Sequence, residues 1–270
     1  MEYQRFNKKI NDIDVEFSLL NHPLINIRDC LKDMSEKHSD CLKDGDIVID
    51  IGANHGTYSL IYASKIGSNG RVYSFEASPN IFKQLEENVS RNKKLNITPI
   101  NKAVTEKKGN YTFHYVDSFV NGGFASETDS GIGACGHSQP VEVEGVNLIE
   151  WINENLSEEE RARISLVKID AEGYDLKIIR SIKDILKDSY GDIRPVVQFE
   201  FFTAISEKEV VDIISTFNDL RYILFYKKDF STKLLNLDLL IHQYNYKRVF
   251  STVSGFDCIA YPIEQILTKK

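Results

Sequence analysis

The sequence predicts an α/β fold with a doubly wound, mostly parallel sheet. Short apolar segments typical of buried strands alternate with longer segments of helical periodicity along most of the chain. One such strand, near residues 46–51, runs into a glycine-containing turn that opens a helix, as in nucleotide-binding α/β folds. The order strand, helix, strand, helix, strand over residues 46–103 requires crossover helices between parallel strands.

In the first half we expect strands at 46–51, 71–76 and 97–103, with helices at 55–66 and 79–92. Ile47, Val48 and Ile49 form a nearly continuous apolar run, which favours a strand covered on both faces. Ser78 and Pro79 predict the start of the second helix, because serine caps helices and proline suits their first position.

The second half continues the alternation. We expect a strand at 111–117, a glycine-rich loop at 118–140, a strand at 141–146, a helix at 147–156 and a strand at 164–170. A helix at 174–187, a strand at 195–200, a helix at 206–218 and strands at 221–227 and 256–261 follow. Residues 1–42 are expected to form an extension that packs a strand and a helix, near 24–34, on a single domain at 43–270.

Composition narrows the function classes. A chain of 270 residues with 42% hydrophobic content can bury a sizeable core. Its 33 basic and 40 acidic residues give a net charge of -7, so no overall positive field attracts nucleic acid or an anionic membrane. The chain lacks an apolar stretch of about 18 residues, and its N-terminus is charged, so we expect a soluble cytoplasmic protein. The four cysteines lack metal-site spacing and are expected to be free thiols. Composition leaves the oligomeric state unassigned.

The turn in VIDIGANHG, residues 48–56, predicts a small-molecule cofactor. It contains the candidate cofactor-binding residues Asp50, Gly52, Ala53, Asn54 and Gly56. A dinucleotide turn has the pattern G-x-G-x-x-G, whose middle glycine is missing here. A ligand with an amino group and a carboxylate, such as S-adenosylmethionine, fits this turn better. The alternative interpretation of Asp50 is structural, with its side chain bracing the turn.

The next strand ends in Glu76, which is expected to accept hydrogen bonds from ribose hydroxyls, because such an acid lies about 20 residues past the glycine turn. Asn101 and Ala103 follow the third strand, where the adenine ring is expected, although asparagine is also an ordinary turn former.

A further motif lies in LVKIDAEGYDLKIIRSI, residues 166–182. It has the pattern K-x-D-x-E-G followed by an acidic residue, here Lys168, Asp170, Glu172, Gly173 and Asp175. Together with VIDIGANHG and FEASP, this motif resembles the FkbM family of S-adenosylmethionine-dependent methyltransferases over approximately residues 43–262. The resemblance implies a Rossmann-like class I methyltransferase fold of seven strands, six of them parallel and the last inserted antiparallel.

The resemblance also implies S-adenosylmethionine as cofactor and O-methylation of a carbohydrate or small metabolite, in surface glycan or natural-product biosynthesis. In such a sheet the ligands lie at the carboxyl ends of the strands. Asp50, Glu76, Asn101, Asp170 and Glu200 are therefore expected around one crevice.

Four residues are candidates for catalysis. Asp170 and Glu172 could act as a general base, orient the acceptor hydroxyl or bind a divalent cation. For Asp170 the competing interpretation is a partly buried pair with Lys168. Glu200 would add a third carboxylate, but no further ligand completes a metal site, so no metal residue is assigned and a divalent cation is the less favoured alternative. His137 lies in the glycine-rich loop at 118–140, which is expected on the acceptor side, and could supply a base near neutral pH.

The remaining expectations concern aromatic residues and rival functions. Tyr174 is expected to line the acceptor pocket, whereas Trp151 is expected in the core. One rival is a non-catalytic S-adenosylmethionine-binding or scaffold protein of the same fold. A less favoured rival is a nicotinamide-dependent dehydrogenase.

Overall fold

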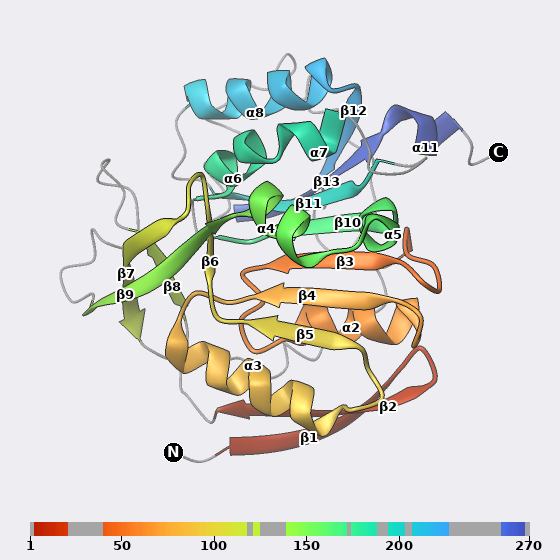
Figure 1. Ribbon diagram of the computed structural model, residues 1–270, viewed down its shortest axis with the longest axis vertical. Helices are drawn as coiled ribbons and strands as arrows, with labels where there is room; N and C mark the ends of the chain where they lie inside the picture. Colours follow the sequence, from red (N-terminus) through yellow and green to blue (C-terminus); the bar gives the residue numbers. More distant parts are fainter. Residues whose placement is uncertain are drawn as a thin grey trace.

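The computed structural model describes residues 3–20, 40–117, 121–124, 139–171, 174–187, 194–202, 207–226 and 255–267. Its centre is a seven-stranded sheet in the order β12-β13-β11-β10-β3-β4-β5 (Figure 1). The strands are β3 (Ile47–Ile51), β4 (Arg71–Phe75), β5 (Ile97–Ile100), β10 (Ile164–Ile169), β11 (Val196–Phe202), β12 (Tyr222–Tyr226) and β13 (Gly255–Pro262). β13 pairs antiparallel with both β11 and β12, and the other pairings are parallel. The predicted fold class is confirmed.

Helices cover both faces of this sheet, which explains why its central strand reads as a continuous apolar run. All five residues of β3 are buried. Val48 belongs to the core that includes α2, whereas Ile49 and Ile51 belong to the core that includes α4, α6, α7 and α8. The helices are α2 (Thr57–Ile66), α3 (Pro79–Arg91), α4 (Leu148–Asn155), α5 (Glu158–Ala162), α6 (Asp175–Ser181), α7 (Lys183–Lys187), α8 (Glu207–Asp219) and α11 (Ile263–Leu267).

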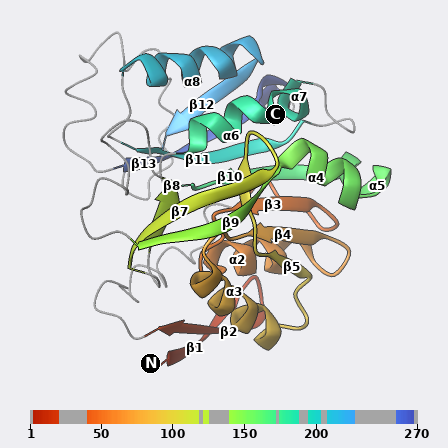
Figure 2. The same cartoon turned by 60° about the vertical axis from the view of Figure 1, so that its left-hand side comes forward.

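A second sheet of four strands lies beside the carboxyl ends of β3 and β4 (Figures 1 and 2). It contains β6 (Ala103–Thr105), β9 (Gln139–Asn147), β7 (Gly109–Asp117) and β8 (Asn121–Phe124), in that order. The predicted strand at 97–103 is therefore wrong at its end, because the chain leaves the main sheet after Ile100 and pairs again, with β9, at Ala103. Ala103, Phe113 and Val143 form a small core under this sheet, against which Ala77 packs.

Two other predicted boundaries are wrong. Residues 121–124, predicted as loop, form β8. Its two glycines lack the side chains from which a strand is predicted, and the strand forms because it pairs with β7. The rest of the loop at 118–140 lies outside the described residues, apart from the start of β9. The predicted helix at 174–187 is divided into α6 and α7 at Ile182, although the N–H of Ile182 still donates to the carbonyl of Ile178 (3.1 Å), which also accepts the hydroxyl of Ser181 (2.8 Å).

The N-terminal residues form a hairpin of β1 (Tyr3–Ile10) and β2 (Ile13–Leu20), joined by Asn11 and Asp12, which both have positive φ. Figure 1 shows the hairpin beside α3, with which β2 is in contact. The predicted helix near 24–34 lies outside the described residues. Cys41 and Cys258 are not disulfide-bonded. Within the described part of the chain, no helix has the length and apolarity needed to cross a membrane.

Candidate functional site

The predicted site residues follow one row of the main sheet. The pairing register places Ile100, Phe75, Ile51, Ile169 and Phe199 side by side across five strands. The next residues along these strands are Asn101, Glu76, Gly52, Asp170 and Glu200. Since neighbouring strands are about 4.8 Å apart, Glu200 lies about 10 Å from Gly52, with Asp170 between them. The structure therefore brings five separated motifs to one edge.

The glycine turn packs tightly against the end of β10. Gly52 has φ +70, and a Cβ there would lie 1.8 Å from the carbonyl oxygen of Asp170. The chain at this point consequently excludes any side chain. Asn54 (φ 52) and Gly56 (φ 88) are also left-handed, which asparagine and glycine tolerate better than other residues. The residue types of the turn are thus explained by its backbone.

The backbone N–H groups of the turn donate hydrogen bonds within the protein. Those of Ala53, Asn54, His55 and Gly56 donate to Phe75 O, Glu76 Oε2, Asn54 Oδ1 and Ala53 O, at 2.8 to 2.9 Å. These four groups are therefore not available to a pyrophosphate. The following helix α2 begins without a side-chain cap and without an acidic residue in its first turn. Its N-terminus suits the carboxylate of a ligand, because the helix dipole favours negative charge there.

Glu76 joins the turn to the start of α3. Its Oε2 accepts the N–H of Asn54 (2.9 Å), and its Oε1 accepts the N–H of Ser78 (2.8 Å). Only 6% of the residue is exposed, and burial raises its pKa to about 7, against the lowering effect of the two N–H donors. Each carboxylate oxygen has a second lone pair, so the group can still accept a hydroxyl donor.

Lys168 forms the centre of a buried charge cluster below the turn. Its Nζ lies 3.1 Å from Asp170 Oδ2, 3.4 Å from the carbonyl oxygen of Gly52 and 3.5 Å from Asp50 Oδ1. It also lies over the ring of Tyr58, 5.1 Å from the centroid. The ion pair of Lys168 with Asp170 is thus present, and it holds the carboxyl end of β10 next to the turn.

Asp50 is fully buried and faces α2. Its Oδ2 accepts the hydroxyl of Ser59 (2.6 Å), which in turn accepts the hydroxyl of Ser74 (2.8 Å). Burial raises the pKa of Asp50, and the nearby ammonium of Lys168 opposes that shift. The described contacts of Asp50 brace the strand end, and a direct contact with the cofactor stays a prediction. Ser59 and Ser74 were not predicted from the sequence, where the only indication of their role is a hydroxyl at an otherwise apolar position.

Asn101 and Ala103 differ in surroundings. Nδ2 of Asn101 donates to the carbonyl oxygens of Glu76 (2.8 Å) and Ala77 (3.2 Å), which ties the ends of β4 and β5 together. Ala103 is 3% exposed and belongs to the core under the four-stranded sheet. Their predicted contact with adenine stays a prediction.

The acceptor side is described only in part. The side chain of Asp170 is 36% exposed, and Glu200 is half-buried on the adjacent strand. Glu172 and His137 lie outside the described residues. Tyr174 precedes α6, where its hydroxyl lies 3.4 Å from Glu106 Oε2; burial raises its pKa to about 12. Its place in an acceptor pocket stays a prediction.

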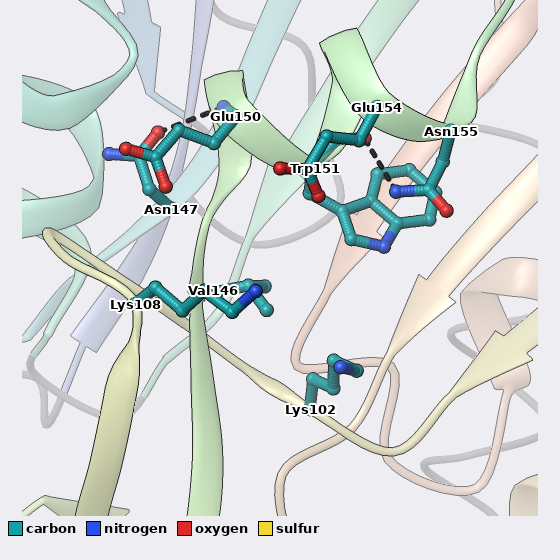
Figure 3. A pocket seen from close by; sticks show the side chains of 8 residues that line it. All are labelled: Lys102, Lys108, Val146, Asn147, Glu150, Trp151, Glu154 and Asn155. Atoms are coloured by element: carbon teal, nitrogen blue, oxygen red, sulfur yellow. Dashed lines mark hydrogen bonds between the residues drawn. The ribbon is translucent and has the colours of Figure 1, made fainter.

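A polar pocket of about 210 Å³ lies along α4 (Figure 3). Its lining includes Lys102, Lys108, Glu150 and Glu154 but none of the predicted site residues. Trp151, which also lines it, packs edge-on against Tyr73 and Phe75, as expected of a core residue. Among the described residues, no group of three histidine, cysteine or acidic side chains could hold a metal ion.

Comparisons with known proteins show the family of the chain. Residues 50–233 match the family described as the methyltransferase FkbM domain. Among solved structures, an FkbM methyltransferase from Methylobacillus flagellatus is similar at 12% identity and a TM-score of 0.46, over 81% of this chain and 44% of that one. Precorrin-6y C5,15-methyltransferase from Geobacter metallireducens is similar at 12% identity and a TM-score of 0.45, over 91% and 93%. A comparison with curated protein sequences gives no significant match.

The family match covers more than half of the chain, from Asp50 at the glycine turn to beyond the end of β12. It therefore includes the glycine turn, Glu76 and the K-x-D-x-E-G motif. The chain belongs to the FkbM family of S-adenosylmethionine-dependent methyltransferases.

Proposed function

We propose that this protein transfers a methyl group from S-adenosylmethionine to a hydroxyl oxygen of a carbohydrate or small metabolite in the cytoplasm. The observation that carries the proposal is the row at the carboxyl edge of the sheet. Glu76, the glycine turn and Asp170 occupy three adjacent strand ends. A donor that spans the first two would present its methyl group near the third.

The residues on the donor side fit S-adenosylmethionine. The uncapped N-terminus of α2 suits the donor's carboxylate, and the buried carboxylate of Glu76 suits its ribose hydroxyls. Asn101 and Ala103 are the residues we assign to the adenine end, and Asp50 braces the turn from below. When bound, S-adenosylmethionine supplies a methyl group that its sulfonium already makes electrophilic.

The protein must align the acceptor hydroxyl with the methyl group and remove the hydroxyl proton. Asp170 is the described acid best placed for this, because its carboxylate is partly exposed beside the turn and its Oδ2 is fixed by Lys168. We assign it the role of general base or orienting group, together with Glu172, Glu200 and His137. General base catalysis of this kind typically contributes about 10²- to 10⁴-fold in rate.

Two observations favour this function over its rivals. The four N–H groups of the turn donate inside the protein, which disfavours the pyrophosphate of a nicotinamide cofactor. The net charge of -7 favours a small or uncharged acceptor over a nucleic acid. A divalent cation is not needed for the proposed proton transfer, so the activity is expected to survive chelation.

The experiment is a comparison of turnover and donor affinity with candidate glycans and metabolites as acceptors. Asp170→Asn, Glu172→Gln, Glu200→Gln and His137→Ala are the test variants. Asp212→Asn on α8, where the acid pairs with Arg180 at the surface, is the control. We expect at least one test variant to lose turnover while S-adenosylmethionine still binds. Unchanged turnover in all four would remove the catalytic assignment, and binding without turnover of any acceptor would favour the scaffold function.

A further inference from the structure

Asn88 of α3 and Asn92, which caps the end of that helix, hydrogen-bond with their side chains to the open edge of β2. Asn88 accepts the N–H of Ser18 (2.8 Å) and donates to its carbonyl oxygen (3.0 Å). Asn92, one turn later, accepts the N–H of Glu16 (2.9 Å) and donates to its carbonyl oxygen (2.6 Å). Each carboxamide thus replaces a residue of a neighbouring strand, and together they attach the N-terminal hairpin to α3.

Asn88 makes one further contact, which Asn92 does not make. Its Nδ2 also donates to the carbonyl oxygen of His55 (2.8 Å), in the middle of the glycine turn. The additional bond of Asn92 goes to the carbonyl of Asn88, within the same helix. Asn88 is completely buried, so loss of its side chain removes a hydrogen-bond partner from buried backbone groups. One side chain therefore joins the hairpin, α3 and the turn.

The turn needs such support. Three of its residues, Gly52, Asn54 and Gly56, have left-handed φ values, so its conformation depends on the hydrogen bonds that hold it. The N–H of Asn54 is held by Glu76, and the carbonyl of the next residue is held by Asn88. Both bonds act on the same short segment, in which Asn54 is held by the carboxylate assigned to the ribose.

We propose that Asn88 is a positioning residue for the methyl donor, and that through it the N-terminal hairpin is part of the donor site. This inference rests on the proposed placement of S-adenosylmethionine at the turn. Because coupling between two sites is reciprocal, donor binding must stabilise the hairpin as much as the hairpin favours donor binding.

The test compares Asn88→Ala with Asn92→Ala in the full-length protein, with S-adenosylhomocysteine as the probe. Both variants lose two hydrogen bonds to the hairpin, so both are expected to lower the Tm by a similar amount. Titration calorimetry at a temperature where both are folded is expected to show a Kd raised about tenfold for Asn88→Ala and within about twofold of wild type for Asn92→Ala. Equal Kd values for the two variants would overturn the inference.

A second measurement needs no variant. In the wild-type protein, amide hydrogen exchange of Ser18 is expected to slow when S-adenosylhomocysteine binds, because the donor fixes the turn to which Asn88 connects this residue. Unchanged exchange of Ser18 in the saturated protein would overturn the inference even if Asn88→Ala does not fold. If the wild-type protein does not bind S-adenosylhomocysteine at all, the proposed donor site itself is wrong, which is a different result.

Discussion

The raised pKa of Glu76 predicts that donor binding depends on pH. In the free protein this carboxylate has a pKa of about 7, because burial opposes its ionisation. In the proposed site, ribose hydroxyls would donate to the ionised form, so a bound donor would lower the pKa and release a proton. If the bound pKa lies below 6, the fraction of protein ready to bind falls from nearly all at pH 8 to about one tenth at pH 6. The Kd should therefore be about tenfold higher at pH 6 than at pH 8.

The assay is titration calorimetry at pH 6, 7 and 8, repeated in two buffers of different ionisation enthalpy. We expect release of about half a proton per bound ligand at pH 7. Methylthioadenosine is the suitable probe, since it keeps the ribose and lacks the amino-acid part, whose α-amino group could titrate in the same range. His55 does not interfere, because burial lowers its pKa to about 4.

The control is Glu76→Gln, which keeps the shape of the side chain but cannot ionise. This variant is expected to bind the probe more weakly at pH 8 and to lose the pH dependence. Two results would contradict the role of Glu76: a wild-type Kd that is the same at pH 6 and pH 8, or a Glu76→Gln variant that keeps the wild-type pH dependence. Either result would mean that Glu76 does not titrate with the ligand.

Three further predictions concern stability, and urea unfolding tests each of them. Gly52→Ala should cost more than Gly45→Ala, because both positions have positive φ but the nearest atom to the added Cβ is 1.8 Å away at the first and 3.9 Å away at the second; equal losses would contradict the tight packing of the turn. Lys168→Met should cost about 3 to 5 kcal/mol, since it leaves a buried carboxylate without its cation, and a loss below about 1 kcal/mol would show that the cluster does not stabilise the fold. His55 must take up a proton when the protein unfolds at pH 5, so stability is lost as pH falls from 6.5 toward 4. His55→Phe should therefore gain roughly 2 kcal/mol relative to wild type between pH 7.5 and pH 5, and no change in that difference would contradict a buried neutral histidine.

The main sheet could be predicted from the sequence because its signals are local. The apolar run at Ile47 to Ile51 and the Ser78 cap each depend on neighbouring residues, and both are present as expected. The row of site residues could also be predicted from the sequence, because parallel strands of similar length end at the same edge of the sheet.

Other features depend on distant partners and left no local signal. β8 is a strand because β7 pairs with its glycines, and β6 leaves the main sheet because β9 is available to it. The roles of Ser59 and Asn88 likewise depend on groups 9 and 33 positions away in the chain. A serine or asparagine in a helix is usually exposed, so only the fold shows that these two are buried and bonded.

The most direct test of the donor site is a crystal structure with S-adenosylhomocysteine bound. We expect the ribose hydroxyls within hydrogen-bond distance of Glu76 Oε1 or Oε2, the carboxylate at the N-terminus of α2 and the sulfur beside Asp170. A ligand bound elsewhere on the protein, with Glu76 bonded only to the N–H groups of Asn54 and Ser78, would contradict it.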